Sequence, residues 1–439
     1  MDAVLTALSG VLWGPATLAL FLGTGLFFTA RSGFLQCRWR MILRGTFGGM
    51  RRVQTDRGVS SFRTLTTALG ACMGTGNIAG VGTALMTGGA GALFWMCVSA
   101  FFGAMTSFAE TVTAIRYRTQ DAGGRHIGGA MIALEKGLGL KKTAAAYAFL
   151  LTVSSFGIGN MAQVNASASA IRTAFGVPPI VTGAVFCVLI ALTVCGGIRR
   201  ISGVAEKTVP LLSVLFMVCA VIALIAHRAQ IPAALRAIWT QAWDFRAAAG
   251  GAAGQAVRVG VTRGVFSNEA GLGSTAVIHA AADTDSAVEQ GFWGIVEVFL
   301  DTVLMCTVTG LVILTSGVPC ADADGAALFA AAMSATFGRA GSVLTALTLA
   351  LLGFASLTGW SYCGERGAAY LFGETRLPVY RVLYAAAAFF GSFLPLDTVF
   401  RLCDVCNVLM ALPNLLCVWL LSGTLFAQIR MYKAGQIGS

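Results

Sequence analysis

Charged residues are scarce in this chain: Asp, Glu, Lys and Arg make up only 11% of its 439 residues. Soluble globular domains carry roughly 25% charge, because a surface that faces water needs it. Hydrophobic residues account for 56% of the sequence, and the mean hydropathy is +0.78. This composition excludes an ordinary soluble protein and is typical of an all-α polytopic membrane protein.

The sequence also lacks the patterns of metal sites and of common catalytic centres. Its three histidines are scattered, and the C-x-x-C pair at Cys403 and Cys406 has no histidine or second pair nearby. Most of the 12 cysteines lie in apolar runs, where thiols behave as small hydrophobes rather than as a disulfide framework. No G-x-S-x-G, H-E-x-x-H or P-loop pattern occurs, and the glycine-bearing loop 122–126 lacks the Lys-Ser/Thr of a phosphate cradle. These absences argue against an enzyme and against direct use of ATP.

Eleven segments are apolar and long enough to cross a bilayer, which requires about 20 residues in a helix. They are residues 11–30, 63–85, 90–115, 144–171, 178–197, 205–226, 257–280, 290–316, 341–362, 380–396 and 398–426. A shorter apolar stretch, 325–337, is predicted to lie in the membrane interface. Asp2 precedes the first run and Arg31 follows it, so we expect a true span there rather than a cleaved signal peptide.

The distribution of basic residues predicts the orientation in the membrane. The segments that would be cytoplasmic with the N-terminus outside hold 22 of the 30 Lys and Arg residues; they are 31–63, 116–143, 198–207, 281–289, 363–381 and 427–439. Positive charge collects on the cytoplasmic side, so we predict an outside N-terminus and a cytoplasmic C-terminus in a bacterial or archaeal cytoplasmic membrane. Because the net charge of +11 is confined to loops, it does not indicate a nucleic-acid partner.

Two apolar segments are interrupted near their middles by glycine and polar residues, at 69–80 and at 264–273. Backbone groups cannot stay unpaired in lipid, so broken helices occur only around a buried cavity, and two of them far apart indicate a secondary-transporter binding site. Each break begins a group of five predicted spans. Because five is an odd number, the second group crosses the membrane with the opposite polarity to the first. We therefore predict one transmembrane domain over 1–439, with an extra first helix and basic loop at 1–62 and inverted five-helix repeats at 63–226 and 257–426.

The first break, Gly74-Thr75-Gly76-Asn77, supplies groups of two kinds. Its free amides at a helix start suit a carboxylate, and the freed carbonyls near Gly70, Cys72 and Met73 suit a dehydrated sodium ion, to which the Asn77 amide oxygen could bridge. The alternative is close helix packing through small residues.

The second break contains Ser267, Asn268 and Glu269. A charge at the bilayer centre costs at least ~2.5–3.5 kcal/mol, so Glu269 should face a cavity or a partner. It could recognise an ammonium group, couple protons or act in gating; the alternative is an internal salt bridge with Arg263.

Further buried polar residues are expected in three other spans. Glu297 and Asp301 share a helix face at i,i+4 spacing, and either could relay protons or bond the broken helices; Glu110 is equally ambiguous. The segment from Phe156 to Asn165 holds three amides that should face the bundle interior, with Gln163 as a substrate contact or as a packing element. Ser356 and Trp360 share a face and form either a pocket wall or ordinary packing.

At these residues the chain resembles the alanine or glycine:cation symporter family, the sodium:alanine symporters. The resemblance covers most of the chain and rests on Gly74–Gly80, Gly88–Met96 with Val98–Gly103, Phe266–Gly273, Glu297–Asp301 and Gly359-Trp360. Cys97 departs from the family pattern, which has tryptophan there.

The resemblance implies the leucine-transporter type of fold and symport of alanine or glycine with sodium, or less often with protons. It implies that the amides of Thr75 and Gly76 hold the substrate carboxylate. It further implies one ion near Asn77 and the Cys72 carbonyl, and a second among Gly70, Met73 and Ser356. Ala355 stands where such sites often have a second hydroxyl residue.

We thus expect cation-coupled symport of a small neutral amino acid, with sodium as the ion and protons as the alternative. The expected substrate-binding residues are Thr75, Gly76, Asn77, Phe156, Gln163, Ser267, Asn268, Ser356 and Trp360. The expected ion ligands are Gly70, Cys72, Met73, Asn77 and Ser356. An uncoupled exchanger or channel is the main alternative, and a membrane-embedded enzyme is a weaker one. The sequence leaves open the choice among alanine, glycine and serine, the stereochemistry and the oligomeric state.

Overall fold

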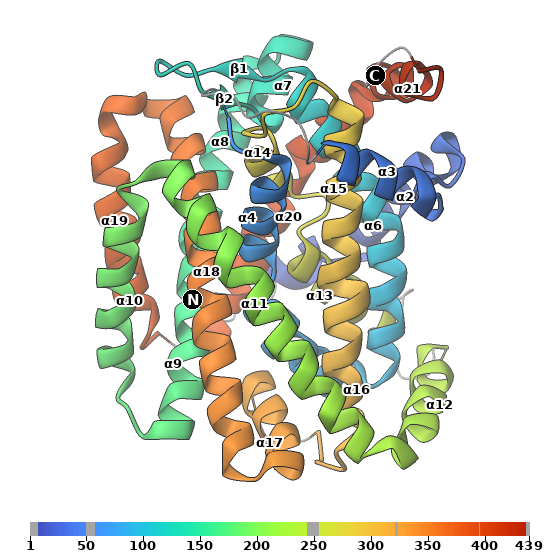
Figure 1. Ribbon diagram of the computed structural model, residues 1–439, viewed down its shortest axis with the longest axis vertical. Coiled ribbons are helices and arrows are strands. Elements are labelled where there is room, and N and C mark those ends of the chain that lie inside the picture. The colour runs from blue at the N-terminus through green and yellow to red at the C-terminus, as the bar shows by residue number, and fades with distance from the viewer. Residues whose placement is uncertain (1–7, 50–57, 244–253, 321–323, 395, 436–439) are drawn as a thin grey trace.

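The chain folds into a bundle of helices, as a computed structural model shows for residues 8–49, 58–243, 254–320, 324–394 and 396–435 (Figure 1). Residues 50–57 of the expected basic loop lie outside the described residues. The main helices of the first half are α2 (Pro15–Ser32), α3 (Trp39–Gly49), α4 (Ser61–Cys72), α5 (Ala79–Gly88), α6 (Gly91–Arg116), α7 (Ala130–Leu138), α8 (Lys141–Phe156), α9 (Ala162–Phe175), α10 (Pro179–Val194), α11 (Gly197–Ala226) and α12 (Ile231–Ala242). Those of the second half are α13 (Gln255–Asn268), α14 (Ser274–His279), α15 (Ala287–Val298), α16 (Thr307–Thr315), α17 (Gly325–Phe337), α18 (Arg339–Phe372), α19 (Leu377–Gly391), α20 (Leu396–Leu420) and α21 (Ser422–Lys433).

Six helical stretches among the described residues are long and apolar enough to cross a membrane. They are Gly91–Arg116, Lys141–Phe175, Gly197–Ala226, Ala287–Thr315, Arg339–Phe372 and Arg401–Leu420. The other predicted spans are helical but shorter or interrupted; they fall on α2, α4 with α5, α10, α13 with α14, and α19. The count of eleven spans and the repeat boundaries remain predictions.

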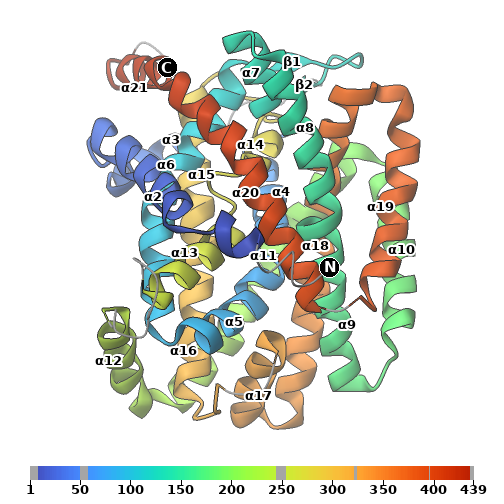
Figure 2. The same cartoon turned by 180° about the vertical axis from the view of Figure 1, so that it is seen from behind.

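Small elements cap the two ends of the bundle. In both views the strands β1 (Thr119–Gln120) and β2 (His126–Ile127) lie with α7 and α21 at one end, which we call the hairpin end (Figures 1 and 2). Helices α12 and α17 lie at the opposite end, which we call the α17 end. Helix α17 covers the predicted interfacial stretch and buries Leu328, Phe329 and Met333.

Both predicted breaks are present. Helix α4 ends at Cys72, a 3-10 turn follows at Thr75–Asn77, and α5 begins at Ala79. Helix α13 ends at Asn268, and α14 begins at Ser274. Helix α4 lies nearer the hairpin end and α5 nearer the α17 end, whereas α13 lies below α14 (Figures 1 and 2). The two broken helices therefore run in opposite directions.

The packing brings the breaks to the middle of the bundle. Helices α13 and α15 both pack on α6, and α8 and α9 pack on α18. Helix α4 contacts both α11 and α18. The interior is dominated by small and aliphatic side chains, together with large aromatic residues such as Phe108, Phe292 and Trp360.

Several elements were not predicted from the sequence. Loop 122–126 falls on the β1–β2 hairpin, whose turn is formed by residues 121–125; there the Asp121 carboxylate accepts the amides of Gly123 and Arg125. Helix α12 begins with Pro232 near its N-terminus, which is a recognisable start signal. The sequence search for long apolar runs passes over such short helices.

The contact between α5 and α17 yields a prediction about stability. A Cβ at Gly82 would lie 2.3 Å from the carbonyl oxygen of Gly325, whereas a Cβ at Gly80 meets nothing within 4 Å. We expect Gly82→Ala to lower the free energy of unfolding by about 1–3 kcal/mol through overpacking. Gly80→Ala, on the same helix, should be neutral or stabilising by roughly 0.5–1 kcal/mol. Thermal unfolding of the purified variants in detergent measures both effects, and equal midpoints would contradict the close packing.

Candidate functional site

Asp301 joins the two broken helices. Its carboxylate accepts the Nδ2–H of Asn77 at 2.7 Å on Oδ1 and the hydroxyls of Ser267 and Thr302, both at 2.7 Å, on Oδ2. The Asp301 carbonyl also accepts Asn77 Nδ2 at 3.0 Å. Asp301 and Asn77 are fully buried, and no Lys or Arg pairs with Asp301 in the described part of the chain. An ionised carboxylate in this position gains from a bound cation.

Within the described part of the chain, two side-chain oxygens of the first break have no hydrogen-bond partner. They are Asn77 Oδ1 and Thr75 Oγ1, both buried. A buried oxygen without a donor costs about 1–3 kcal/mol. The Asn77 oxygen, on an amide that bonds the Asp301 carboxylate, is of the kind that a hard cation prefers as a ligand.

The first break redirects the hydrogen bonds of the backbone. In a continuous helix Thr75 N would pair with Ala71 O; here Thr75 N donates to Gln163 Oε1 at 2.8 Å, and Ala71 O accepts the Ser356 hydroxyl. Gly74 N donates to Cys72 O at 2.8 Å instead of to Gly70 O. At the break the Gly70 carbonyl therefore loses its usual helical donor, Gly74 N, and the Thr75 amide donates to a side-chain oxygen.

Gln163 is held between the break and its own helix. Its Nε2 donates to Ile158 O at 3.0 Å, and Ile158 belongs to a π-helical segment, Gly157–Met161, between α8 and α9. A wide turn of this kind is frequent at functional sites because it re-aims the side chains around it. Gln163 thus lies at the first break, with its oxygen on an amide predicted to bind a carboxylate; its role as a substrate contact stays a prediction.

Glu269 connects the second break to α18. It is one of two described non-glycine residues with positive φ, at 56°, a conformation that is uncommon outside glycine. Its carboxylate accepts Trp360 Nε1 at 2.7 Å and the Ser274 hydroxyl. The salt bridge with Arg263 considered from the sequence is wrong, because Arg263 pairs with Asp404 at 3.5 Å.

The remaining predicted site residues lie at different distances from this centre. The backbone of Gly76 faces Phe266 and Ser267 across the two breaks. Asn268 Nδ2 donates to Thr302 at 3.2 Å. Met73 receives the Ser213 hydroxyl on its sulfur. Phe156 is not brought to the breaks: its ring lies 5.5 Å from that of Tyr380 and 5.7 Å from that of Tyr384.

The sequence did not identify Asp301 as the common partner of both breaks. It lies in a second π-helical segment, Phe299–Cys306, which interrupts the regular i,i+4 pairing with Glu297. Glu297 bonds His279 at 2.8 Å instead. The available signal in the sequence was an aspartate that follows a glutamate by four residues in an apolar run. Only the fold shows that the two carboxylates bond different partners.

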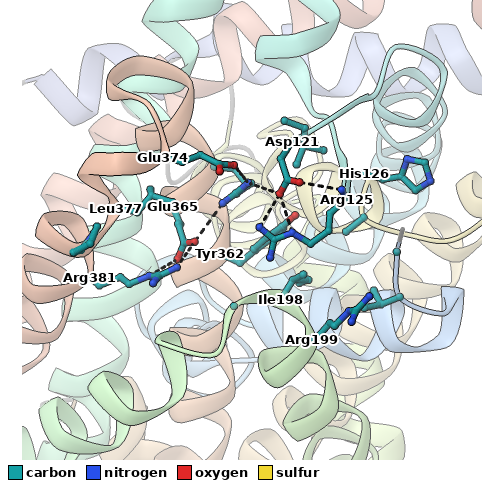
Figure 3. A pocket seen from close by; sticks show the side chains of 17 residues that line it. Asp121, Arg125, His126, Ile198, Arg199, Tyr362, Glu365, Glu374, Leu377 and Arg381 are labelled. Atoms are coloured by element: carbon teal, nitrogen blue, oxygen red, sulfur yellow. Dashed lines mark hydrogen bonds and ion pairs between the residues drawn. The ribbon is translucent and has the colours of Figure 1, made fainter. Parts of the chain in front are cut away.

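A second polar cluster lies at the hairpin end. It lines a cavity of about 240 Å³ and ties the hairpin to α18 and α19 (Figure 3). Asp121 bonds Arg125 at 2.8 Å and lies 3.8 Å from Arg366, and Arg381 holds Glu365 through two hydrogen bonds of 2.8 and 3.1 Å. These ion pairs join elements from both halves of the chain at this end of the bundle.

Known structures share this architecture. The chain superposes on the transporter MhsT in complex with L-phenylalanine with a TM-score of 0.63, over 84% of this chain and 90% of that one, at 14% identity. A Na⁺-coupled sialic acid symporter gives a TM-score of 0.53 over 89% and 83%, also at 14% identity. At such identity the likeness shows the fold alone. The fold is that of membrane transporters of the leucine-transporter type, built around two broken helices.

The sequence comparisons then give the family. The family model described as "Sodium:alanine symporter family" matches residues 1–437. The sodium/alanine symporter AgcS of Methanococcus maripaludis is 40% identical over 98% of this chain and 97% of its own length. The amino-acid carrier protein AlsT of Bacillus subtilis is 34% identical over 94% and 88%. The chain belongs to the sodium:alanine symporter family; it is a multi-pass membrane transporter and not an enzyme.

The ion pairs at the hairpin end predict a pH effect on stability. Burial by itself raises the pKa of Asp121, but the hydrogen bonds and charge of Arg125 outweigh it and lower the pKa from its ordinary value. Because the pKa is lower in the folded state than in the unfolded state, the ionised carboxylate stabilises the fold. This stabilisation is fully present at a pH above the ordinary pKa of about 3.9, and it is lost as the pH falls through the lowered pKa of the folded state. We expect Asp121→Asn to destabilise the protein near neutral pH and to flatten the loss of stability in acid. Thermal unfolding midpoints measured from acid to neutral pH test this, with Glu374→Gln, at a half-exposed residue, as the control. If Asp121→Asn loses stability in acid as steeply as the wild type does, the stabilising role of the Asp121 carboxylate is refuted.

Proposed function

We propose that this protein takes up a small neutral amino acid, alanine or glycine, together with sodium by alternating access. Cation-coupled amino-acid symport follows from the family. The named substrate and ion rest on the printed description of AgcS as a sodium/alanine symporter and on the geometry at the breaks. The observation that carries the proposal is Asp301, a buried carboxylate that bonds both broken helices and, among the residues that the structure describes, no basic side chain.

The substrate carboxylate is proposed to bind at the first break. The Thr75 amide already holds an oxygen, that of Gln163, and a carboxylate would take its place there and extend to the Gly76 amide. Free amides at a helix start favour a negative oxygen through the helix dipole. Trp360, whose indole is held by Glu269 in the second break, would form one side of the site.

The sodium ions are cargo and are proposed to bind at two places beside the substrate. The first is formed by the Asp301 carboxylate, Asn77 Oδ1 and the Cys72 carbonyl, where the unpartnered Asn77 oxygen supports the assignment. The second is formed by the carbonyls of Gly70 and Met73 with Ser356, whose hydroxyl already contacts the adjacent Ala71 carbonyl. Because the first site contains a carboxylate, we expect it to dominate the sodium affinity.

Alternating access would open the two ends in turn. We place the hairpin end in the cytoplasm, following the distribution of basic residues, and the α17 end outside. Opening to the cytoplasm would separate the ion pairs that join different elements at the hairpin end, those of Asp121 with Arg366 and of Glu365 with Arg381. One charge crossing 100 mV yields about 2.3 kcal/mol, which supports roughly a fortyfold solute gradient before the sodium gradient is added.

Removing the Asn77 amide tests the site directly. We expect Asn77→Ala to abolish sodium-driven alanine accumulation while the protein still inserts normally, because the variant loses both the bond to Asp301 and an ion ligand. Uptake of radiolabelled alanine into proteoliposomes, with sodium and pH gradients imposed separately, measures this. Asn165→Ala is a matched control, since it also removes a buried amide that bonds backbone carbonyls, of Gly391 and Leu394. Wild-type uptake by Asn77→Ala would refute the assignment, and exchange unaffected by removing sodium would favour an uncoupled exchanger.

Neutralising Asp301 tests the ion site. Asp301→Asn keeps the shape of the side chain but removes its charge, and a hydrogen bond or ligand contact to a charged group is worth roughly 1.5–3 kcal/mol. We expect the sodium concentration for half-maximal uptake to rise on the order of 10- to 100-fold, with a smaller change in the alanine KM at saturating sodium. Sodium titrations of alanine uptake measure both constants. An unchanged sodium requirement would mean that Asp301 has a structural role only.

A further inference from the structure

A groove on the outer side of the bundle lies between α8, α18 and α19. Its volume is about 460 Å³, and its walls include Phe156 at the end of α8, Phe372 at the end of α18, and Val379 and Leu383 on α19. Phe372 is 62% exposed, Val379 58% and Leu383 55%, so these side chains face away from the bundle interior. Helix α19 forms an outer edge of the bundle in both views (Figures 1 and 2). Because α8 and α18 belong to stretches long and apolar enough to cross a membrane, the groove opens toward lipid.

The walls of the groove are apolar except at one end. Two hydroxyl residues line it, Thr152 and Tyr380, and protein groups bond both hydroxyls. Thr152 Oγ1 donates to Ala148 O at 2.8 Å, and the Tyr380 hydroxyl lies 3.0 Å from Ser155 Oγ. Polar groups that are already bonded have no need of water or of a polar ligand. Such walls suit a hydrocarbon chain, which is held by close packing and needs no hydrogen-bond partner.

Arg376 supplies a positive charge at the end of the groove that lies toward the hairpin end. It is the last residue of the 3-10 turn Glu374–Arg376 between α18 and α19, and it is exposed. Among the described residues no acidic side chain forms an ion pair with it. Glu374 lies 3.7 Å from Arg366 instead and lines the cavity at the hairpin end. A guanidinium group matches the geometry of a phosphate and binds it through parallel hydrogen bonds.

The order of charge and apolar wall along the groove follows that of a phospholipid. Leu383 comes seven residues after Arg376, which corresponds to about 10 Å along a helix. One leaflet contributes roughly 15 Å of the hydrocarbon core of a bilayer. An acyl chain that begins beside Arg376 therefore meets apolar side chains over most of the depth of its leaflet.

We propose that this groove binds an anionic phospholipid, with the phosphate on Arg376 and one acyl chain between α8, α18 and α19. The lipid comes from the leaflet at the hairpin end, which the basic loops predict to be cytoplasmic. A zwitterionic phospholipid brings an ammonium group close to the guanidinium, and the two like charges repel each other. The charge of the groove therefore favours a head group that is negative overall.

The groove adjoins the π-helical segment that holds Gln163. Phe156 directly precedes this segment, Gly157–Met161, and its ring lies 5.7 Å from that of Tyr384. The Tyr384 hydroxyl donates to Gly159 O at 3.1 Å, and the same segment anchors Gln163. An acyl chain packed on Phe156 thus supports, through consecutive contacts, the segment that places Gln163 at the first break. This consequence for uptake rests on the proposed function, whereas the binding of lipid does not.

Native mass spectrometry of the full-length protein in detergent tests the binding of lipid. Titration with phosphatidylglycerol should give a tighter first binding step than titration with phosphatidylcholine. Arg376→Gln should weaken the binding of phosphatidylglycerol about fivefold and abolish the preference. Leu383→Trp, which places a larger ring in the groove, should weaken the binding of both lipids. Both substituted side chains are exposed, so these variants should fold.

Two control variants separate this groove from other parts of the surface. Arg236→Gln removes an exposed arginine from α12, at the opposite end of the bundle. Val188→Trp enlarges an exposed side chain in a second groove, on α10, whose lining residues are all apolar. Both controls should keep the wild-type preference for phosphatidylglycerol. Equal affinity of the wild type for the two lipids, or wild-type binding by Arg376→Gln or Leu383→Trp, would overturn the proposal.

Uptake into proteoliposomes tests the consequence for transport. Wild-type alanine uptake should be faster in phosphatidylcholine vesicles that contain phosphatidylglycerol than in vesicles without it, by up to about fivefold, the preference that one arginine provides. Arg376→Gln should remove this difference, and Arg236→Gln should retain it. The surface potential of the vesicles acts on every variant alike, so it cannot produce this pattern. No difference in the wild type, or an undiminished one in Arg376→Gln, would contradict the link to transport. If no vesicle shows uptake, the proposed function fails, and mass spectrometry still decides the lipid site.

Discussion

The structure depends on satisfying polar groups that two broken helices expose inside an apolar bundle. Each break removes regular backbone hydrogen bonds at a depth where no bulk water replaces them. Side chains from other elements take their place: Gln163 accepts the Thr75 amide, Ser356 donates to the Ala71 carbonyl, and Asp301 bonds both breaks. The fold is held together at its centre by the same groups that make it suitable for binding ions and zwitterions.

The two π-helical segments place these side chains. One, Gly157–Met161, provides the Ile158 carbonyl that anchors Gln163. The other, Phe299–Cys306, carries Asp301 and Thr302. An extra residue in one helical turn changes the direction of the side chains that follow it. Neighbouring carboxylates in one helix therefore point to different partners. Glu297 thereby bonds His279 while Asp301 bonds Asn77 and Ser267. One helical stretch thus places Asp301 at the proposed ion site and Glu297 against a different helix.

Much of this arrangement was predictable from the sequence, because the constraints of lipid on the backbone are strict. The breaks at Asn77 and Ser267 follow from glycine and polar residues in apolar runs, and the family follows from the motifs around them. What could not be predicted are contacts that depend on side-chain direction. Phe156 packs toward Tyr380 instead of the breaks, Arg263 pairs with Asp404 and not with Glu269, and the role of Asp301 depends on a helical irregularity that leaves no mark in the sequence.

The hydrogen bond between Gln163 and the Thr75 amide bears on how such a carrier completes its cycle. A protein that could close its centre only around a bound solute would be restricted to swapping one molecule for another. Here an oxygen of the protein itself bonds the amide proposed for the solute carboxylate. If the two acceptors replace each other on the Thr75 amide, this amide stays paired throughout the cycle, at a depth where an unpaired backbone group is costly, and net accumulation as well as one-for-one exchange becomes possible.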